Sequence, residues 1–297
     1  MKEVSSVSES VLDGGYANRL GKRKIWMIAK RVIVYSILIF VAGLLLLPFV
    51  WMISSSLRLD RDVFTVPIQW IPRNPIWTNY LNIWIRIPLL TFISNTIRLT
   101  VIVTILQLLT SSFAAYAFSK LSFPGKNVLF LAYVGTIAVP WHVFMVPQFV
   151  MLRSLGLFDT HMAIIILQAF TAFGVFLMKQ FYDSVPTELI EAARIDGMSE
   201  YMIWRKIMLP LSKPALATLT IFTFVFVWND FLGPRLYLVN TQLHTVQLGI
   251  RNFIGQFATE FGLVMAVAVV SLIPVLIVFL ALQKFFVQGI ATSGMKG

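Results

Sequence analysis

The sequence predicts an all-α membrane protein with six transmembrane helices and both termini in the cytoplasm. Of its 297 residues, 58% are hydrophobic and only 12% are charged, whereas soluble domains carry roughly 45–50% apolar and about 25% charged residues. The hydrophobic residues form long uninterrupted runs, and the basic residues collect between alternate runs. An ordinary soluble enzyme is therefore excluded, because it could not bury so much apolar surface.

Six stretches between consecutive charged residues are long enough to be transmembrane helices. A helix needs about 20 mostly apolar residues to cross the ~30 Å hydrocarbon layer, and these stretches lack the alternating polarity of a transmembrane strand. The expected spans are Val32–Leu57, Leu99–Ser119, Asn127–Leu152, Thr160–Met178, Pro214–Asn229 and Phe261–Gln283. The fifth stretch is the shortest and is expected to continue past Asp230 to the outer surface.

The distribution of basic residues predicts the orientation. With both termini inside, the inner segments hold sixteen of the 24 Lys and Arg residues, including every Lys. These segments are 1–31, 119–126, 179–213 and 284–297. This bias follows the positive-inside rule. The formal net charge of +11 is therefore explained by membrane topology, without a nucleic-acid partner.

The expected topology divides the chain into three parts. A polar cytoplasmic segment comprises residues 1–31, the six-helix transmembrane domain comprises 32–283, and a cytoplasmic tail comprises 284–297. The transmembrane domain includes a long inner loop at 183–213.

Absent residue types exclude several chemistries. The chain has no Cys and only three His, which argues against disulfides, thiolate catalysis and a dedicated metal enzyme. Its Gly-Lys pairs, Gly21-Lys22 and Gly125-Lys126, lack both the upstream Gly and the following Ser or Thr of a phosphate-binding loop. We therefore expect a non-catalytic chain that binds no cofactor of its own.

The inner loop has the pattern of two short helices joined at a corner. Pro186 suits a first helical turn and Gly197 suits the left-handed residue that ends a helix. Ser199 suits the N-cap of a second helix, which Pro210 is expected to end.

One face of the first short helix carries small residues. Ile190, Ala193 and Gly197 share this face, where the backbone of a partner could approach closely. A helix lying on lipid is the alternative, although such helices usually present bulky apolar residues to the membrane. The spacing favours protein docking and leaves the interfacial helix open.

The inner loop resembles the EAA loop of ABC-importer permeases. It contains Glu191-Ala192-Ala193, then Asp196-Gly197, with Pro210 thirteen residues after Gly197. Other stretches resemble the MalG-like permeases of carbohydrate importers, and the resemblance covers about residues 28–297. These stretches are Tyr116–Phe118 with Phe123–Lys126, Trp228–Leu232, and Phe285–Gly289 with Gly294–Gly297.

The resemblance implies a fold, a function and partners. The fold would be that of a type I ABC importer permease in the bacterial inner membrane, with its permease domain at 32–283. The function would be uptake of a carbohydrate, of the oligosaccharide type, delivered by an extracytoplasmic solute-binding protein. The other partners would be a second related permease subunit, membrane lipid, and a dimer of ATP-binding cassette ATPases that binds ATP and Mg.

The resemblance also assigns residues that couple the chain to the ATPase. The EAA segment would be a coupling helix seated in a cleft of the ATPase, with Glu191 paired to a basic residue there. Ala192 and Ala193 would make close contact, and Gly197 would form the corner. The full set implied for coupling is Glu191, Ala192, Ala193, Arg194, Asp196, Gly197, Pro210, Lys296 and Gly297.

A cluster at the end of the fifth span is the candidate substrate pathway. Neutral sugars offer hydroxyls to polar side chains and C–H faces to aromatic rings. An acid near the end of a span is costly unless it faces a cavity or a partner. For Asp230 the alternatives stay open that it caps the Gly233-Pro234 turn or pairs with an outer Arg. The candidates are Phe226, Trp228, Asn229, Asp230 and Trp141.

Other functions stay open. A related permease could carry glycerol phosphate or a uronate oligosaccharide, since no motif separates these substrates. An ion-coupled secondary carrier is less consistent with the sequence, because such carriers place ionisable residues within several spans and these spans hold almost none. A purely structural anchor would leave the inner loop unexplained.

Overall fold

The computed structural model describes residues 3–255 and 259–294. In this part of the chain all regular structure is helical, apart from an isolated bridge between Ile254 and Thr259. The α-helices are α1 (Glu3–Ser56), α2 (Asp60–Val63), α3 (Thr78–Arg86), α4 (Leu89–Lys120), α5 (Lys126–Gly135), α6 (Met145–Ser154), α7 (His161–Gln168), α8 (Ala172–Asp183), α9 (Thr187–Ile195), α10 (Glu200–Ile203), α11 (Leu209–Leu211), α12 (Lys213–Trp228), α13 (Leu232–Tyr237), α14 (Val246–Ile250) and α15 (Phe261–Gly294). Tighter or wider turns are η1 (Thr136–Ala138), η2 (Trp141–Phe144), the π-helix η3 (Trp204–Met208), η4 (Thr241–Leu243) and η5 (Arg251–Phe253).

Between four and six membrane spans are present in the described residues. Four segments are long and apolar enough to cross a membrane: Trp26–Ser56, Leu89–Lys120, His161–Asp183 and Phe261–Phe285. Two further pairs of helices qualify only if each bent pair counts as one span. All six expected stretches are therefore largely helical. The third and fifth belong to bent pairs of helices, and the fourth contains a short break between α7 and α8.

The expected third span, Asn127–Leu152, is not a straight helix. The paths before and after Pro140 are bent by 93° relative to one another. Proline lacks the N–H that continues a helix, and the preceding Val139 is extended (φ −88°, ψ 116°), as a residue before proline prefers. A second bend of 79° lies at Ser212, immediately before α12.

The ends of the other spans differ modestly from expectation. Helix α4 begins at Leu89, ten residues before the expected start, because Arg98 lies on its exposed face and does not interrupt it. A long basic side chain can keep its charge in water while its stem follows an apolar surface. Helix α15 continues from the expected sixth span into the expected tail, as far as Gly294.

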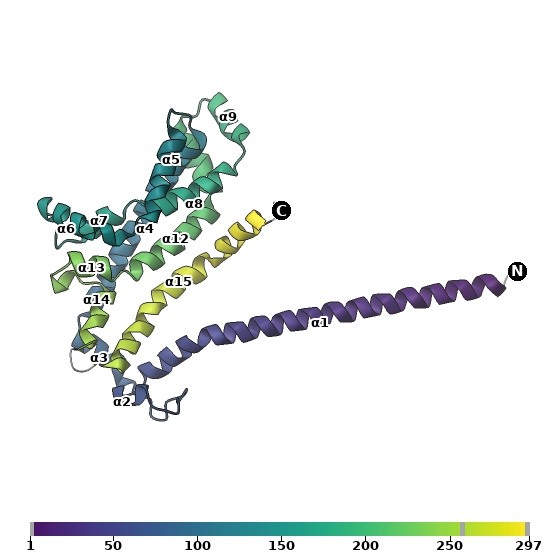
Figure 1. Ribbon diagram of the computed structural model, residues 1–297, viewed down its shortest axis with the longest axis horizontal. Coiled ribbons are helices and arrows are strands. Elements are labelled where there is room, and N and C mark those ends of the chain that lie inside the picture. Colours follow the sequence, from purple (N-terminus) through teal and green to yellow (C-terminus); the bar gives the residue numbers. More distant parts are fainter. Residues whose placement is uncertain (1–2, 256–258, 295–297) are drawn as a thin grey trace.

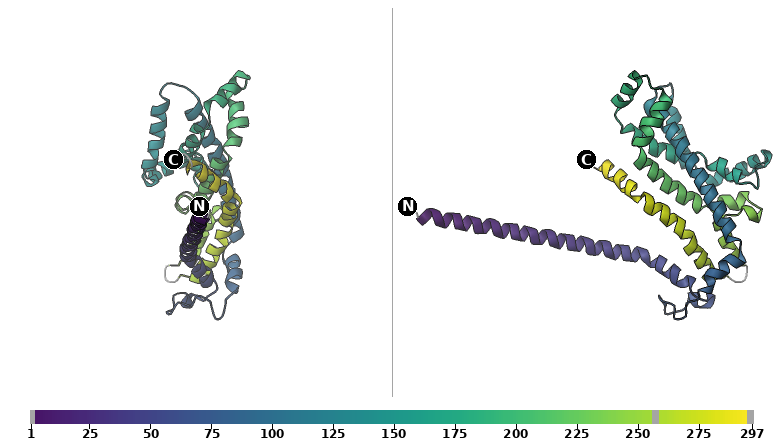
Figure 2. Two further views of the ribbon diagram at one scale, coloured as in Figure 1. Left: turned by 90° about the vertical axis from the view of Figure 1, so that its right-hand side faces the viewer. Right: turned by 180° about the vertical axis from the view of Figure 1, so that it is seen from behind.

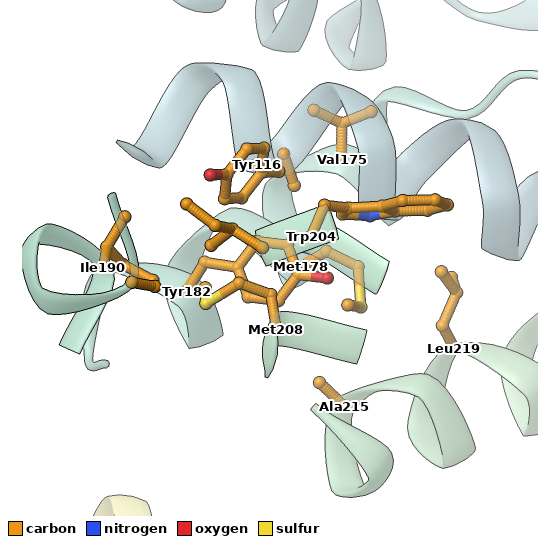
Figure 3. Close-up of a cluster of buried hydrophobic side chains, with 12 residues drawn as sticks. Tyr116, Val175, Met178, Tyr182, Ile190, Trp204, Met208, Ala215 and Leu219 are labelled. Atoms are coloured by element: carbon orange, nitrogen blue, oxygen red, sulfur yellow. The ribbon is translucent and has the colours of Figure 1, made fainter. Parts of the chain in front are cut away.

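Helices α4, α8, α12 and α15 pack side by side and form the body of the molecule (Figure 1). A buried cluster lies at the end of this body beside α9, and it includes Tyr116, Met178, Tyr182, Ile190 and Trp204 (Figure 3). A second cluster lies at the opposite end, where α3 and α14 pack against α4 and α15. The two clusters fix the two ends of the helical body.

Helix α1 runs away from this body, as the turned views in Figure 2 show. The C-terminal part of α1 packs on α15. Every residue of α1 from Trp26 to Val50 is exposed in the isolated chain. Such an apolar surface needs lipid or another transmembrane chain around it.

Candidate functional site

Helix α9 ends in a glycine corner, as the sequence predicts. Gly197 has φ +80°, and its N–H donates to the Arg194 carbonyl at 3.0 Å. The N–H of Met198 donates to the Ala193 carbonyl, also at 3.0 Å. This pair of bonds is a Schellman motif, which places a left-handed residue just after the helix. Glycine suits that position because it has no Cβ to clash.

The second helix of the loop starts as predicted but extends further. Ser199 is its N-cap, and its hydroxyl accepts the Met202 N–H at 3.4 Å. Pro210 was expected to end this helix, but it lies within α11, and the bend follows at Ser212. Proline has no N–H to continue the regular helical pattern, and the wider π-helical turn η3 lies immediately before α11.

An ion pair closes the corner from the side. The Arg194 guanidinium donates from Nε to Glu200 Oε1 at 2.7 Å and from a terminal nitrogen to the Lys120 carbonyl at 3.2 Å. The Tyr116 hydroxyl donates to the same Glu200 carboxylate. Arg194 therefore contacts its own chain and fixes the corner to the end of α4.

The expected open face of α9 is wrong for two of its three residues. Ile190 is fully buried and Ala193 is 5% exposed, because both pack into the cluster with Tyr182 and Met208 (Figure 3). Spacing alone cannot show that α9 folds back onto α8 and η3. The face that stays open carries Glu188, Glu191, Ala192 and Ile195, and Ile195 is 86% exposed.

The remaining coupling candidates are Asp196, Lys296 and Gly297. Asp196 is the exposed C-cap residue of α9, next to Gly197. Lys296 and Gly297 lie outside the described residues.

An interruption between α7 and α8 forms the second candidate region. The helix stops at Gln168 and restarts after Thr171, whose hydroxyl accepts the Gly174 N–H at 3.4 Å. Two carbonyls freed by the break are satisfied from α4. Gln107 Nε2 donates to the Gln168 carbonyl at 2.7 Å, and Thr110 donates to the Ala169 carbonyl at 2.9 Å. Irregular backbone at membrane depth needs such replacement partners.

A cavity of about 470 Å³ lies beside this interruption. Its walls come from α4, η2, α7, α8, α12 and α13 and combine aromatic rings with hydroxyls and amides. The wall residues with aromatic or polar side chains are Gln107, Trp141, Gln168, Phe170, Thr171, Phe173, Phe222, Thr223, Phe226, Asp230 and Tyr237. Asp230 is the sole charged side chain among the described wall residues.

The polar groups of the cavity are only partly satisfied. Gln168 Nε2 donates to Asp230 Oδ2 at 2.7 Å, and Thr223 donates to Gln107 Oε1 at 2.8 Å. The amide oxygen Oε1 of Gln168 is buried and has no hydrogen-bond partner within the described residues. An unpaired buried acceptor of this kind is satisfied when a ligand hydroxyl or a water donates to it.

Asp230 combines two of the roles considered for it. Its Oδ1 accepts the Gly233 N–H at 3.0 Å, so it caps the turn before α13. Its Oδ2 accepts from Gln168 Nε2, and both residues line the cavity. A Cβ at position 233 would collide with this carboxylate, which accounts for the glycine.

Trp141 and Phe226 also line the cavity, whereas Trp228 and Asn229 do not. Trp228 is 1% exposed, stacks on Phe224, and donates to the Ser271 carbonyl at 3.0 Å. Asn229 is exposed, and its amide oxygen accepts from Gln247 at 3.3 Å. The candidates near the end of α12 therefore divide by helix face, with Phe226 and Asp230 toward the cavity and Trp228 and Asn229 away from it.

Several wall residues were not expected from the sequence. Gln107 and Thr223 face each other from α4 and α12, and Tyr237 comes from α13. Gln107 carries a readable signal, because a lone amide in a long apolar run is usually placed against a partner or a cavity.

Residues 26–292 match the family described as "Binding-protein-dependent transport system inner membrane component". The chain belongs to this family. It is therefore a transport permease subunit of the inner membrane and not a catalytic chain. The family assignment agrees with the EAA-loop resemblance.

Relatives of this permease include transporters with different named substrates. The arabinooligosaccharides transport system permease protein AraQ of Halalkalibacterium halodurans is 30% identical over 261 residues, which cover 87% of this chain and 94% of the relative. The sn-glycerol-3-phosphate transport system permease protein UgpE of Salmonella typhimurium is 31% identical over 268 residues, covering 87% and 95%.

A solved structure has the same fold. It is the crystal structure of a bacterial ABC transporter involved in the import of the acidic polysaccharide alginate. One of its chains superposes with a TM-score of 0.75 at 28% identity, covering 86% of this permease and 95% of that chain. The fold is therefore that of an ABC importer permease.

Proposed function

We propose that this permease is one of two related membrane subunits of an ATP-driven carbohydrate importer. A solute-binding protein delivers the sugar, and a dimer of ATP-binding cassette ATPases binds ATP with Mg and hydrolyses it. The observation that carries the proposal is the α9 corner (residues 187–200), a braced helix with an exposed isoleucine at its tip. The second permease covers apolar surface that this chain leaves open, including that of α1.

The open face of α9 docks on the ATPase. Burying a side chain such as Ile195 contributes roughly 1.5–3 kcal/mol, which rewards a partner with an apolar cleft. Glu191 lies on the same exposed face and pairs with a basic residue of the partner. Ala192 between them permits close approach.

Helix α4 transmits a movement of α9 to the cavity. The corner is bonded to Tyr116 and Lys120 at the end of α4, and Lys120 Nζ donates to the Val185 carbonyl at 2.7 Å, just before α9. The same helix α4 carries Gln107, which bonds the backbone at the α7–α8 break. A displacement of the corner therefore shifts the helices that shape the cavity.

The cavity suits a neutral carbohydrate. Its aromatic rings fit the C–H faces of a sugar, and its amides and hydroxyls fit sugar hydroxyls. A glycerol phosphate or a uronate would meet the Asp230 carboxylate, and no basic side chain stands among the described wall residues to balance the repulsion.

Reconstitution of the complete transporter in proteoliposomes tests the proposal. We expect uptake of neutral oligosaccharides that needs both ATP and the solute-binding protein. An excess of uronate oligosaccharide or glycerol phosphate should not compete. Uptake driven by a proton or sodium gradient without ATP would overturn the proposal in favour of a secondary carrier.

A further inference from the structure

The segment that follows α1 folds into a compact loop at residues 57–76. The Ile76 N–H donates to the Leu57 carbonyl at 2.8 Å and closes the loop at its base. Inside the loop, the Thr65 hydroxyl donates to the Asp62 carbonyl at 3.1 Å. The loop is therefore held in one shape at the end of a membrane span.

This loop encloses a polar pocket of about 290 Å³. Three arginines line it, namely Arg58, Arg61 and Arg73, with Asp62 as the one acidic side chain among its described wall residues. The Asp62 carboxylate lies 3.7 Å from Arg61 Nε. The nearby Asp60 carboxylate accepts the Gly262 N–H at 2.8 Å. The pocket thus has an excess of positive charge.

Arg58 is the buried member of the three and is only 4% exposed. One terminal nitrogen donates to Ser54 Oγ at 2.9 Å and the other approaches the Asp62 carbonyl at 3.4 Å. Its Nε has no hydrogen-bond partner, and it forms no ion pair with any described carboxylate. A buried guanidinium without a counter-ion is costly, so this site is incomplete without an anion.

Exposed apolar side chains lie on the same loop as the pocket. Val66 is 91% exposed, Ile71 is 84% exposed and Trp70 is 44% exposed. Tryptophan and aliphatic side chains at the end of a membrane helix are typical of the lipid interface. A free phosphate ion would gain nothing from contact with these apolar side chains.

We propose that the arginine pocket (Arg58, Arg61 and Arg73) binds the phosphate headgroup of an anionic phospholipid. Guanidinium groups bind phosphate oxygens through paired charge-assisted hydrogen bonds. The exposed apolar residues of the loop contact the glycerol and upper acyl region of the same lipid. The site lies at the opposite end of the molecule from α9 (Figure 1), and it is independent of the substrate cavity.

The test uses the complete purified transporter and short-chain phosphatidylglycerol, followed by the shift in thermal midpoint and by native mass spectrometry. We compare the wild type with the double variant Arg61→Gln/Arg73→Gln, which spares buried Arg58. Arg251→Gln is the control, because Arg251 is also exposed but lies outside the pocket. We expect phosphatidylglycerol to bind at least about tenfold more weakly to the double variant and with unchanged affinity to the control.

Three outcomes would overturn the proposal. Equal binding of neutral phosphatidylcholine would remove the role of the anion. An equal response to inorganic phosphate would assign the pocket to a free ion. Unchanged phosphatidylglycerol binding in the double variant, together with weaker binding of the solute-binding protein, would assign it to a protein contact.

Discussion

The α9 corner and the cavity both contain polar groups, but these groups are hydrogen-bonded to different extents. At the corner, the backbone turn, the Arg194–Glu200 pair and the Tyr116 hydroxyl are all bonded within the chain. In the cavity, Gln168 keeps an unpaired buried oxygen, and Phe222 and Phe226 remain 49% and 65% exposed. An element whose polar groups are all hydrogen-bonded within the chain transmits movement without deforming. A site with unpaired polar groups can instead form hydrogen bonds with a ligand.

The corner is most directly broken by Gly197→Val. A β-branched residue at φ +80° costs about 1–2 kcal/mol, or roughly a factor of ten in population. We expect the transporter to assemble in the membrane but to lose about tenfold in ATP-driven uptake. Gly156→Val is the matched control, since Gly156 has φ +68° but lies between α6 and α7. Equal losses in both variants would contradict a specific role for the corner.

The cavity is tested by Asp230→Asn. The amide keeps an oxygen that can accept the Gly233 N–H, but it loses the negative charge and the second oxygen, which accepts from Gln168. Hydrogen bonds to charged groups contribute about 1.5–3 kcal/mol, so we expect the apparent affinity for sugar to fall about tenfold with assembly intact. Asn229→Ala is the control outside the cavity and should transport normally. An unaltered uptake profile for Asp230→Asn would leave only the capping role.

Trp228→Phe separates packing from transport. The change removes a buried indole N–H that donates to the carbonyl and hydroxyl oxygens of Ser271. We expect a lower thermal midpoint, equivalent to about 1–3 kcal/mol, with unchanged uptake per folded transporter. A changed sugar preference at normal stability would return Trp228 to the substrate pathway.

The smallest effect is expected for the ion pair of the corner. Arg194→Ala, Glu200→Ala and the double variant form a cycle whose coupling energy should be about 0.2–1 kcal/mol, because both side chains are partly exposed. Thermal unfolding of the purified transporter measures it. Zero coupling would mean that the turn and the buried cluster alone hold the corner.

Local chemistry made the corner predictable. The left-handed Gly197 and the cap at Ser199 depend on residues within one or two turns, and the turn rules describe them well. The bend at Pro140 follows from the same rules, whereas a run of uncharged residues carries no sign of it. The membrane character followed from composition.

Long-range packing decided what the sequence could not supply. Ala193 and Ile195 are both apolar residues of one short helix, and only the fold of α9 onto the body separates the buried one from the exposed one. The α7–α8 break depends on Gln107 and Thr110, about 60 residues away in the chain. Trp228 and Phe226 are likewise aromatic residues of one helix, and only the packing of α12 decides which of them lines the cavity.

Cysteine cross-linking of α9 to the ATPase tests the central claim most directly. The chain has no native Cys, so Ile195→Cys introduces its single thiol. We predict that this variant cross-links to the ATPase in the assembled transporter and that the yield changes with ATP, while Ile190→Cys at the buried face does not cross-link. Free labelling of Ile195→Cys by a water-soluble thiol reagent, unchanged by the ATPase and without any cross-link, would contradict the account.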